Sequence, residues 1–339
     1  MRIAVLAPVA WRTPPRHYGP WEQIAFNITE GLVKKGFDVT LFATKDSYTS
    51  GHLDGVIEKG YEEDEHSDAK VSECLHISYL MEKANEFDII HNHFDFLPLT
   101  YSSFIKTPMI TTIHGFSSPK IIPVYKKYNA INHYISISNA DRSGELHYLD
   151  TIYHGIEKTA FTFNETPKDY LLYFGRIHPD KGTYDAIQIA KAVNKKLIIA
   201  GIIQDHKYYK EKVEPYTDGE QIIFEGHAGP EKRNELLGNA LALLHPIYFN
   251  EPFGLSVAEA MFCGTPVIAY NKGSMPELIQ HNISGFLVNN LHEATDCISM
   301  LHKISRKNCS AYAREKFSYN KMIEKYISAY KYVLSHPLK

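Results

Sequence analysis

Two glutamates flank an expected helix start in the stretch from His245 to Glu277. An apolar run at 241–244 predicts a buried parallel strand, and the proline-broken loop after it carries Glu251. A helix is expected from Gly254 to Gly264, with Glu259 inside it. Loops at the carboxyl ends of parallel strands bind ligands, and the free N–H groups of a helix start bind anions. The two carboxylates therefore suit a ligand that has a phosphate centre and hydroxyls on both sides.

Two cations follow another expected strand, Tyr170–Phe174. In the segment G-R-I-H-P-D-K-G, Arg176 leaves this strand and Lys181 enters the next helix, so both can converge above one helix start. Arginine bonds phosphate oxygens through paired N–H donors, and lysine supplies a compact positive charge. This pattern predicts a diphosphate site that needs no metal ion. The alternative is a pair of surface cations.

The segment E-P-F-G-L-S-V-A-E-A-M-F-C-G-T-P-V-I-A resembles the signature of the retaining glycosyltransferases of family 4. That resemblance implies a GT-B fold, an α/β fold in which two Rossmann-like, doubly wound parallel-sheet domains face each other across a cleft. It also implies that Glu251 bonds hydroxyls of the donor sugar and that Glu259 bonds the ribose of the nucleotide. The backbone of Phe253, Gly254 and Leu255 would then meet the sugar and the diphosphate.

Three further segments resemble the same family. The segment G-R-I-x-P-x-K-G implies that Arg176 and Lys181 hold the diphosphate, and T-I-H-G implies that His114 contacts the donor sugar. In Y-G-P-W-E, Gly19 keeps the first of the family's two glycines and Pro20 replaces the second. Proline removes a backbone donor to phosphate, or it simply begins the helix. In such folds the strand ends near Gly201 and His227 form the pocket for the base and ribose.

The chain alternates strands and helices, which predicts parallel sheets. The first domain is expected at 1–156, the donor-binding domain at 157–319, and a helix at about 320–339 is expected to pack back on the first domain. Expected strands are 2–7, 38–43, 88–91, 109–113, 133–137, 170–174, 196–201, 221–226, 241–244 and 266–269, and a helix is expected at 21–35. His91 and His93, at the end of the third of these strands, are interpreted either as lining the acceptor side or as structural.

Composition narrows the class of protein. The 339 residues exceed what one core usually supports, and the net charge of −3 gives no indication of a nucleic-acid partner. Residues 1–156 carry 14 basic and 19 acidic side chains, so at most peripheral contact with an anionic membrane is expected. The acidic cluster at 62–65 is interpreted as a solvated loop. The four scattered cysteines and the lack of an apolar leader predict a cytoplasmic protein.

The sequence thus predicts a retaining hexosyltransferase that uses a nucleotide diphosphate sugar, with a UDP-sugar favoured over GDP-mannose, and a carbohydrate or glycolipid hydroxyl as acceptor. Bacterial surface polysaccharide, glycolipid or glycoside synthesis is the expected setting. No metal or other cofactor is expected, and the resemblance favours front-face attack in which the leaving phosphate takes the acceptor's proton. The alternatives are a nucleotide-sugar 2-epimerase, a sugar phosphorylase and a non-catalytic nucleotide-sugar-binding protein.

Overall fold

The computed structural model describes residues 1–116 and 118–338. By its internal contacts the chain divides into two compact units. The first comprises residues 1–137, 142–153 and 320–338, and the second comprises residues 138–141 and 154–319. Lys339, the last residue of the helix expected at 320–339, lies outside the described residues. Each unit is built on one parallel sheet, so the predicted α/β class with two Rossmann-like domains is confirmed.

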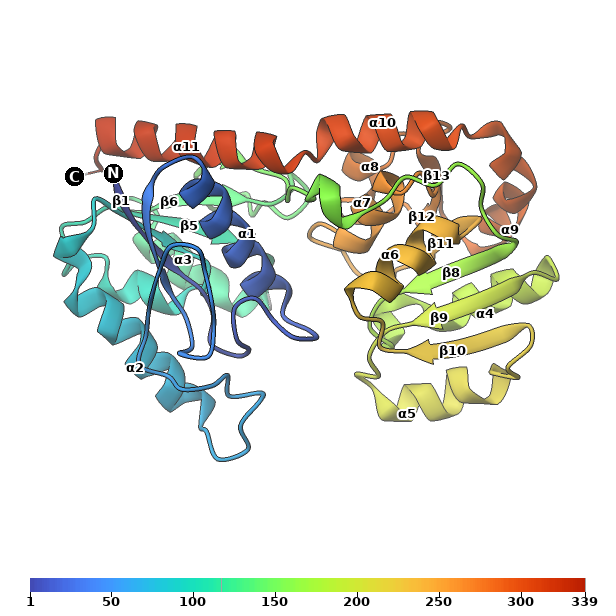
Figure 1. Ribbon diagram of the computed structural model, residues 1–339, viewed down its shortest axis with the longest axis horizontal. Helices are drawn as coiled ribbons and strands as arrows, with labels where there is room; N and C mark the ends of the chain where they lie inside the picture. The colour runs from blue at the N-terminus through green and yellow to red at the C-terminus, as the bar shows by residue number, and fades with distance from the viewer. Residues whose placement is uncertain (117, 339) are drawn as a thin grey trace. The chain divides into compact units, whose positions relative to one another are not determined.

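The first sheet has the strand order β3-β2-β1-β4-β5-β6-β7, and every pairing in it is parallel. Its strands are β1 (Arg2–Leu6), β2 (Asp38–Phe42), β3 (His52–Asp54), β4 (Ile89–Asn92), β5 (Met109–Ile113), β6 (His133–Ser136) and β7 (Tyr148–Thr151). Its helices are α1 (Pro20–Lys34), α2 (Ala69–Glu82), α3 (Ile122–Tyr128) and α11 (Tyr319–Ser335), of which α11 belongs to this unit from residue 320 onward. In Figure 1, α11 is the red helix labelled near β5 and β6.

The second sheet has the order β10-β9-β8-β11-β12-β13, again with every pairing parallel. Its strands are β8 (Tyr170–Phe174), β9 (Lys196–Ala200), β10 (Ile222–Gly226), β11 (Ala242–His245), β12 (Val267–Tyr270) and β13 (Gly285–Val288). Its helices are α4 (Thr183–Ala192), α5 (His206–Tyr208), α6 (Pro230–Asn239), α7 (Leu255–Phe262), α8 (Met275–Leu278), α9 (Leu291–Met300) and α10 (Arg306–Lys316). None of the helices in the described ranges is long and apolar enough to cross a membrane.

Apolar periodicity explains most of these elements. In α1, Ile24, Ala25, Ile28 and Leu32 recur at helical spacing and are buried against the sheet, as expected. The central strands are buried on both faces; β1 and β11 are mainly apolar runs, whereas β4 and β5 also bury polar side chains. Three strands were not predicted: β3 and β7, at the two edges of the first sheet, and β13, at one edge of the second. Each has three or four residues. The polar segments of β3 and β7 lack the apolar run by which a strand is recognised, whereas β13 has such a run but only four residues.

Candidate functional site

The predicted diphosphate site begins where β8 ends. Arg176 follows this strand, and a short 3-10 helix, Pro179–Lys181, leads to Gly182 and α4. Gly182 has a left-handed φ of 69°, and a Cβ atom there would lie 1.9 Å from the carbonyl oxygen of Pro246. Only glycine permits this close approach, since any side chain would overlap the backbone. The approach brings the segment that carries Lys181 against the loop that follows β11.

Lys181 and Glu251 form an ion pair between these two loops. Each side chain is only 12% exposed, and the Lys181 ammonium also lies 4.5 Å from the ring centre of Phe249. The His245 ring lies 3.6 Å from the Glu251 carboxylate, too far for a hydrogen bond. Burial alone would raise the pKa of Glu251, but the neighbouring His245 and the charge of Lys181 outweigh it and lower this pKa to about 2. Glu251 is therefore an anion at any physiological pH.

Lys181 lies in an environment that disfavours its charge. Burial lowers the pKa of the Lys181 ammonium, the charge of Glu251 opposes that effect, and the charge of Arg176 adds to it. The Arg176 guanidinium donates to the side-chain oxygen of Gln204, and the Arg176 carbonyl accepts from the hydroxyl of Tyr173 at 2.8 Å. Two cations and one carboxylate thus gather at this edge of the second sheet. An anionic ligand would relieve the repulsion between the cations.

The loop after Glu251 is fixed through its backbone. Ser274 donates from its N–H to the Glu251 carbonyl at 2.9 Å and from its hydroxyl to the Phe253 carbonyl at 2.6 Å. The Phe253 side chain is 2% exposed, with the rings of His154 and Phe317 at 5.0 and 5.8 Å, so only its backbone is available to a ligand. Gly254 precedes α7 with a φ of 93°. The N–H groups of Val257 and Ala258 already donate to the Gly254 carbonyl, at 3.1 and 3.3 Å. The N–H groups of Leu255 and Ser256 at the very start of the helix remain to suit an anion.

The Glu259 side chain does not join the Lys181–Glu251 pair but contacts another helix of the same unit. It is 5% exposed and forms an ion pair with Arg233 of α6. Burial raises the pKa of Glu259, and the charge of Arg233 opposes that effect. The Arg233 guanidinium lies 5.7 and 5.5 Å from the rings of Phe161 and Phe174. Arg233 was not predicted from the sequence, because one arginine in a polar helical segment gives no indication of its partner.

The strand ends predicted for the base lie close together. The Gly201 N–H donates to the Gly226 carbonyl at 2.8 Å, and a Cβ atom on Gly201 would lie 1.8 Å from the Gly175 carbonyl oxygen. His227 follows directly and is exposed. The ends of β8, β9 and β10 therefore form one backbone surface beside Arg176.

In the first unit, His114 follows β5 and is 7% exposed. Its ring stacks on Trp21 at 5.5 Å with an interplanar angle of 21°, and its Nε2 atom lies 2.9 Å from Nδ1 of His93. Gly19 precedes α1, and Pro20 is the first residue of that helix, as one of the two explanations of Pro20 requires.

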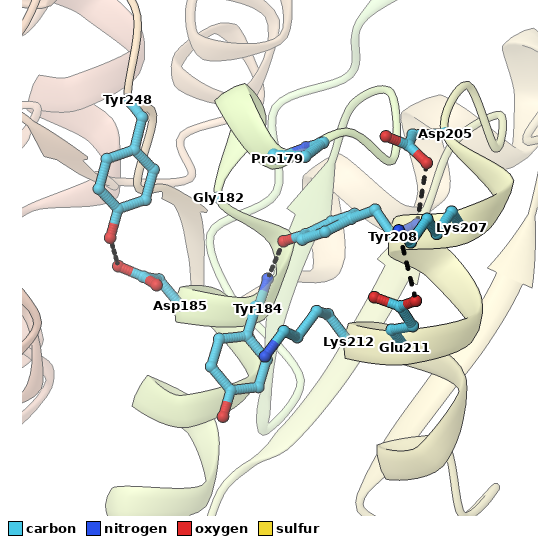
Figure 2. A pocket seen from close by; sticks show the side chains of 10 residues that line it. All are labelled: Pro179, Gly182, Tyr184, Asp185, Asp205, Lys207, Tyr208, Glu211, Lys212 and Tyr248. Carbon is cyan, nitrogen blue, oxygen red and sulfur yellow. Dashed lines mark hydrogen bonds and ion pairs between the residues drawn. The ribbon is translucent and has the colours of Figure 1, made fainter.

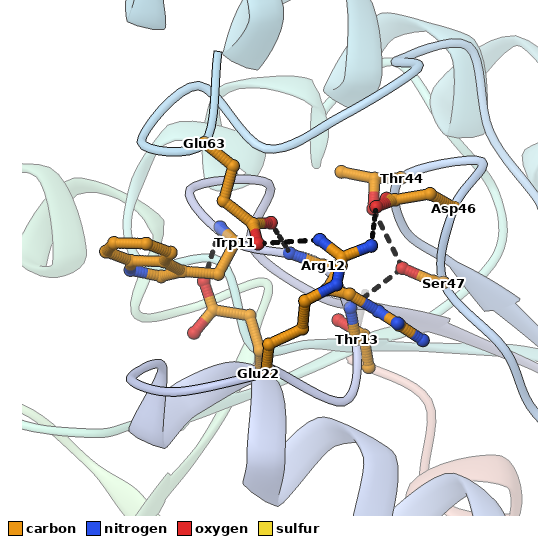
Figure 3. A network of polar contacts seen from close by, with 9 residues as sticks. Trp11, Arg12, Thr13, Glu22, Thr44, Asp46, Ser47 and Glu63 are labelled. Atoms are coloured by element: carbon orange, nitrogen blue, oxygen red, sulfur yellow. Dashed lines mark hydrogen bonds and ion pairs between the residues drawn. The ribbon is translucent and has the colours of Figure 1, made fainter. Parts of the chain in front are cut away.

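The loop before α1 is tied to acidic residues (Figure 3). Glu63 accepts from the Arg12 N–H at 3.0 Å and from the Arg16 guanidinium at 2.9 Å, and its side chain is 15% exposed. Asp46 accepts from the other end of the same guanidinium at 3.1 Å. The interpretation of the cluster at 62–65 as a solvated loop is therefore wrong for Glu63. It anchors the loop that leads to Gly19.

Glu22 is expected to make the first unit less stable as the pH rises. Its carboxylate is 3% exposed beside the Trp11 N–H, and burial raises its pKa to about 7 (Figure 3). A raised pKa means that the folded state holds the proton more tightly, so the stabilisation is full below about pH 4.5 and is lost as the pH passes through 7. Glu22→Gln should remove this loss, up to about 3 kcal/mol between pH 5 and pH 8.

The measurement is urea unfolding of Glu22→Gln and wild type at both pH values, followed by tryptophan fluorescence. Trp11 and Trp21 are the chain's two tryptophans, so this signal reports the first unit alone. Glu58→Gln is the matched control, because Glu58 is 77% exposed. Equal pH dependence in Glu22→Gln and in wild type would contradict the prediction.

A pocket of about 350 Å³ lies beside Gly182, but neither Lys181 nor Glu251 lines it (Figure 2). Its polar groups bond mainly to one another. Asp185 accepts from the hydroxyls of Tyr248 at 2.6 Å and Tyr270 at 2.5 Å, and the Tyr208 hydroxyl accepts from the Tyr184 N–H at 2.9 Å. We therefore place the candidate site at the Lys181–Glu251 pair rather than in this pocket.

Comparison with known proteins matches residues 156–321 to the family described as glycosyl transferases group 1. An uncharacterized glycosyltransferase of Methanocaldococcus jannaschii is 23% identical over 345 residues, and the match covers 84% of each chain. AviGT4, a glycosyltransferase involved in avilamycin A biosynthesis, has a similar structure, with a TM-score of 0.73, 22% identity and coverage of 99% of this chain and 98% of that one. Anabaena HepE, solved with UDP and glucose, has a TM-score of 0.75, 19% identity and coverage of 98% and 99%. This chain has the fold of these two solved proteins.

Proposed function

We propose that this chain, in which residues 156–321 form a glycosyl transferases group 1 region, is a retaining glycosyltransferase that moves a hexosyl unit from a nucleotide diphosphate sugar to a hydroxyl. The observation that carries the proposal is the buried ion pair of Lys181 and Glu251 beside the start of α7. It joins a cation suited to phosphate and a carboxylate suited to sugar hydroxyls. The UDP and glucose bound by HepE support a UDP-sugar as the donor, with GDP-mannose as the alternative.

The proposed chemistry follows from the charges that form. Breaking the bond between the anomeric carbon and the phosphate builds negative charge on the leaving diphosphate and positive charge on the sugar ring. Arg176, Lys181 and the N–H groups at the start of α7 would stabilise the diphosphate by preorganised electrostatics. These groups supply the positive charge that a metal ion would otherwise supply. The leaving phosphate would take the proton of the acceptor hydroxyl during front-face attack, so that the configuration is retained.

The remaining residues are assigned to binding. Glu251 would accept from hydroxyls of the donor sugar, and Glu259 would bond the ribose. The backbone at 253–255 would meet the sugar and the diphosphate, and the strand ends at Gly201 and His227 would contact the base. From the first unit, His114 would contact the donor sugar and Gly19 would approach a phosphate. The acceptor would be a carbohydrate or glycolipid hydroxyl in surface polysaccharide, glycolipid or glycoside synthesis.

The test is a thermal-shift screen of nucleotide sugars, with and without EDTA, followed by transfer assays with the donor that binds. A donor at 100 times its Kd should stabilise the protein by about 2.7 kcal/mol. We expect binding and transfer to survive EDTA, because side chains and backbone dipoles meet the charge of the leaving group.

Three outcomes would contradict parts of the proposal. Loss of transfer in EDTA that Mg²⁺ or Mn²⁺ restores would remove the metal-free mechanism. An isomerised donor in the absence of acceptor would indicate an epimerase. Donor binding with neither hydrolysis nor transfer across a panel of acceptors would indicate a nucleotide-sugar-binding protein.

A further inference from the structure

Two neighbouring strands of the first unit place four polar side chains on one face of their sheet. His91 lies in β4 and His93 just beyond it, while Thr112 lies in β5 and His114 just beyond it. Side chains two residues apart on a strand point to the same face. The strands are parallel, and His91 lies opposite Ile110. Two residues further along β5, Thr112 is the polar neighbour of His91, and His114 is likewise the polar neighbour of His93. Three of the four are 0% exposed, and His114 is 7% exposed.

The four side chains form a continuous line of hydrogen bonds. His91 bonds Thr112 through Nε2 at 2.8 Å, and its Nδ1 lies 3.2 Å from Nε2 of His93. The other ring nitrogen of His93, Nδ1, lies 2.9 Å from Nε2 of His114. This line connects the interior of the unit to the histidine that we assign to the donor sugar.

Helix α11 provides the inner end of this line. Tyr330 places its hydroxyl 2.6 Å from Nδ1 of His91, and Tyr326, one turn earlier, places its hydroxyl 3.0 Å from the Thr112 hydroxyl. Residues four apart lie on the same face of a helix. Both tyrosines are 0% exposed. The same helical face therefore touches both strands.

The direction of these hydrogen bonds follows from the Tyr330 hydroxyl. Burial raises the pKa of Tyr330 well above its ordinary value, so the phenol keeps its proton. Burial also lowers the pKa of His91 well below its ordinary value, so that ring is neutral, with one donor and one acceptor nitrogen. Within residues 1–116 and 118–338, the hydrogen-bond partner of the Tyr330 hydroxyl is Nδ1 of His91. The phenol therefore donates, and Nδ1 of His91 accepts.

The rest of the line follows from that first bond. With Nδ1 as its acceptor, His91 carries its proton on Nε2 and donates to Thr112. His93 is fully buried, which favours its neutral form. Its Nε2 then shares the Nδ1 lone pair of His91 with the Tyr330 hydroxyl, as the weaker donor at 3.2 Å, and its own Nδ1 accepts. His114 must donate to it from Nε2. The proton positions on the three rings are therefore coupled in this arrangement.

We propose that Tyr330 is a positioning residue that, through His91 and His93, fixes His114 in the tautomer with the proton on Nε2 and the lone pair on Nδ1. The functional part of this inference rests on the proposed contact of His114 with the donor sugar. In this tautomer Nδ1 can only accept, so any group that bonds it must be a hydrogen-bond donor, as a sugar hydroxyl is. The ring also keeps its orientation without help from the ligand.

The first experiment measures the tautomer and needs no sugar. Two-bond ¹H–¹⁵N correlation spectra of protein with ¹⁵N-labelled histidine distinguish protonated from unprotonated ring nitrogens, and the signals absent from His114→Gln identify His114. We expect wild-type His114 to be protonated on Nε2. Tyr330→Phe should give a mixture of tautomers, because the ring of residue 330 stays in place while its donor is lost. Tyr326→Phe is the matched control, because it loses a buried hydroxyl from the same helix, and it should keep the wild-type tautomer.

The second experiment measures transfer kinetics of the same variants. Tyr330→Phe should lower kcat by about tenfold, the scale of one hydrogen bond, with little change in the affinity for the nucleotide diphosphate. Tyr326→Phe should stay within about twofold of wild type, because the Tyr330 donor remains. If the tautomer changes in Tyr330→Phe and kcat does not, the positioning role is refuted.

A proton on Nδ1 of wild-type His114 would overturn the proposal outright, and so would an unchanged tautomer in Tyr330→Phe. Should Tyr330→Phe not fold, the wild-type spectrum still decides between the two arrangements. Failure of the proposed function would appear differently, as a wild-type protein that has the expected tautomer but transfers no sugar.

Discussion

Lys181→Ala is expected to lower turnover by about 10²–10³-fold, or roughly 3–4 kcal/mol, which is the scale for removing one preorganised electrostatic donor. The reason is that Lys181 would meet charge that grows as the bond to phosphate breaks, so its interaction is stronger in the transition state than in the ground state. Arg176→Ala should have a similar effect. Arg176→Lys should recover only part of the loss, because an ammonium point charge replaces a guanidinium that can bond two phosphate oxygens at once.

The measurement is transfer kinetics, with the fold of each variant checked by circular dichroism. The check matters because Lys181→Ala leaves the Glu251 carboxylate buried without its cation, which destabilises a protein by about 3–5 kcal/mol. Lys195→Ala is the matched control, since it breaks the more exposed ion pair of Lys195 with Asp169 in the same unit. A folded Lys181→Ala variant with near-normal turnover would show that the diphosphate is held elsewhere.

Glu251→Ala and Glu259→Ala should affect different steps. We expect Glu251→Ala to lower turnover strongly while the Kd for the nucleotide diphosphate changes little, because the lost contact is to the sugar. Glu259→Ala should instead weaken binding of the nucleotide itself. Calorimetric titration with the nucleotide diphosphate, beside transfer kinetics, separates the two effects.

The glutamine variants at both positions serve as controls, because they keep the side-chain volume and remove only the charge. They also show how much of each loss comes from an unpaired Lys181 or Arg233. Equal effects of the two alanine substitutions on nucleotide affinity would contradict the assignment of sugar to one glutamate and ribose to the other.

The sequence predicted the central strands well because their chemistry is local. The bounds of β5 and β8 agree with the predictions to the residue. The strand β8 is an apolar and aromatic run and β5 is rich in β-branched residues, and both have polar or turn residues at their ends. Other predicted strands differ by a residue or two, and the edge strands β3, β7 and β13 were missed, whereas the edge strand β10 was predicted. In β3 every side chain is at least partly exposed, so nothing in the segment distinguishes it from a loop.

The candidate site could be predicted only in part. Lys181 follows β8 and Glu251 follows β11, and these two parallel strands are neighbours in the sheet. It was therefore predictable that both residues lie at the same end of the sheet. The ion pair between them was not predictable, because it depends on the close approach of Gly182 to the Pro246 carbonyl, and these two residues are far apart in the sequence. The same holds for Arg233 with Glu259 and for Trp21 with His114. Contacts between side chains of different elements leave no periodic trace in a single sequence.

The path of the chain has a consequence for how the protein is made. Residues 320–338 belong to the first unit, although the ribosome adds them only after the whole segment 154–319. Until then the face of the first sheet that carries His91 and Thr112 lacks Tyr326 and Tyr330. The second unit can close as soon as its own residues have emerged, whereas the unit begun first must wait. A chain cut before residue 320 would therefore leave β4 and β5 without the tyrosines that bond His91 and Thr112.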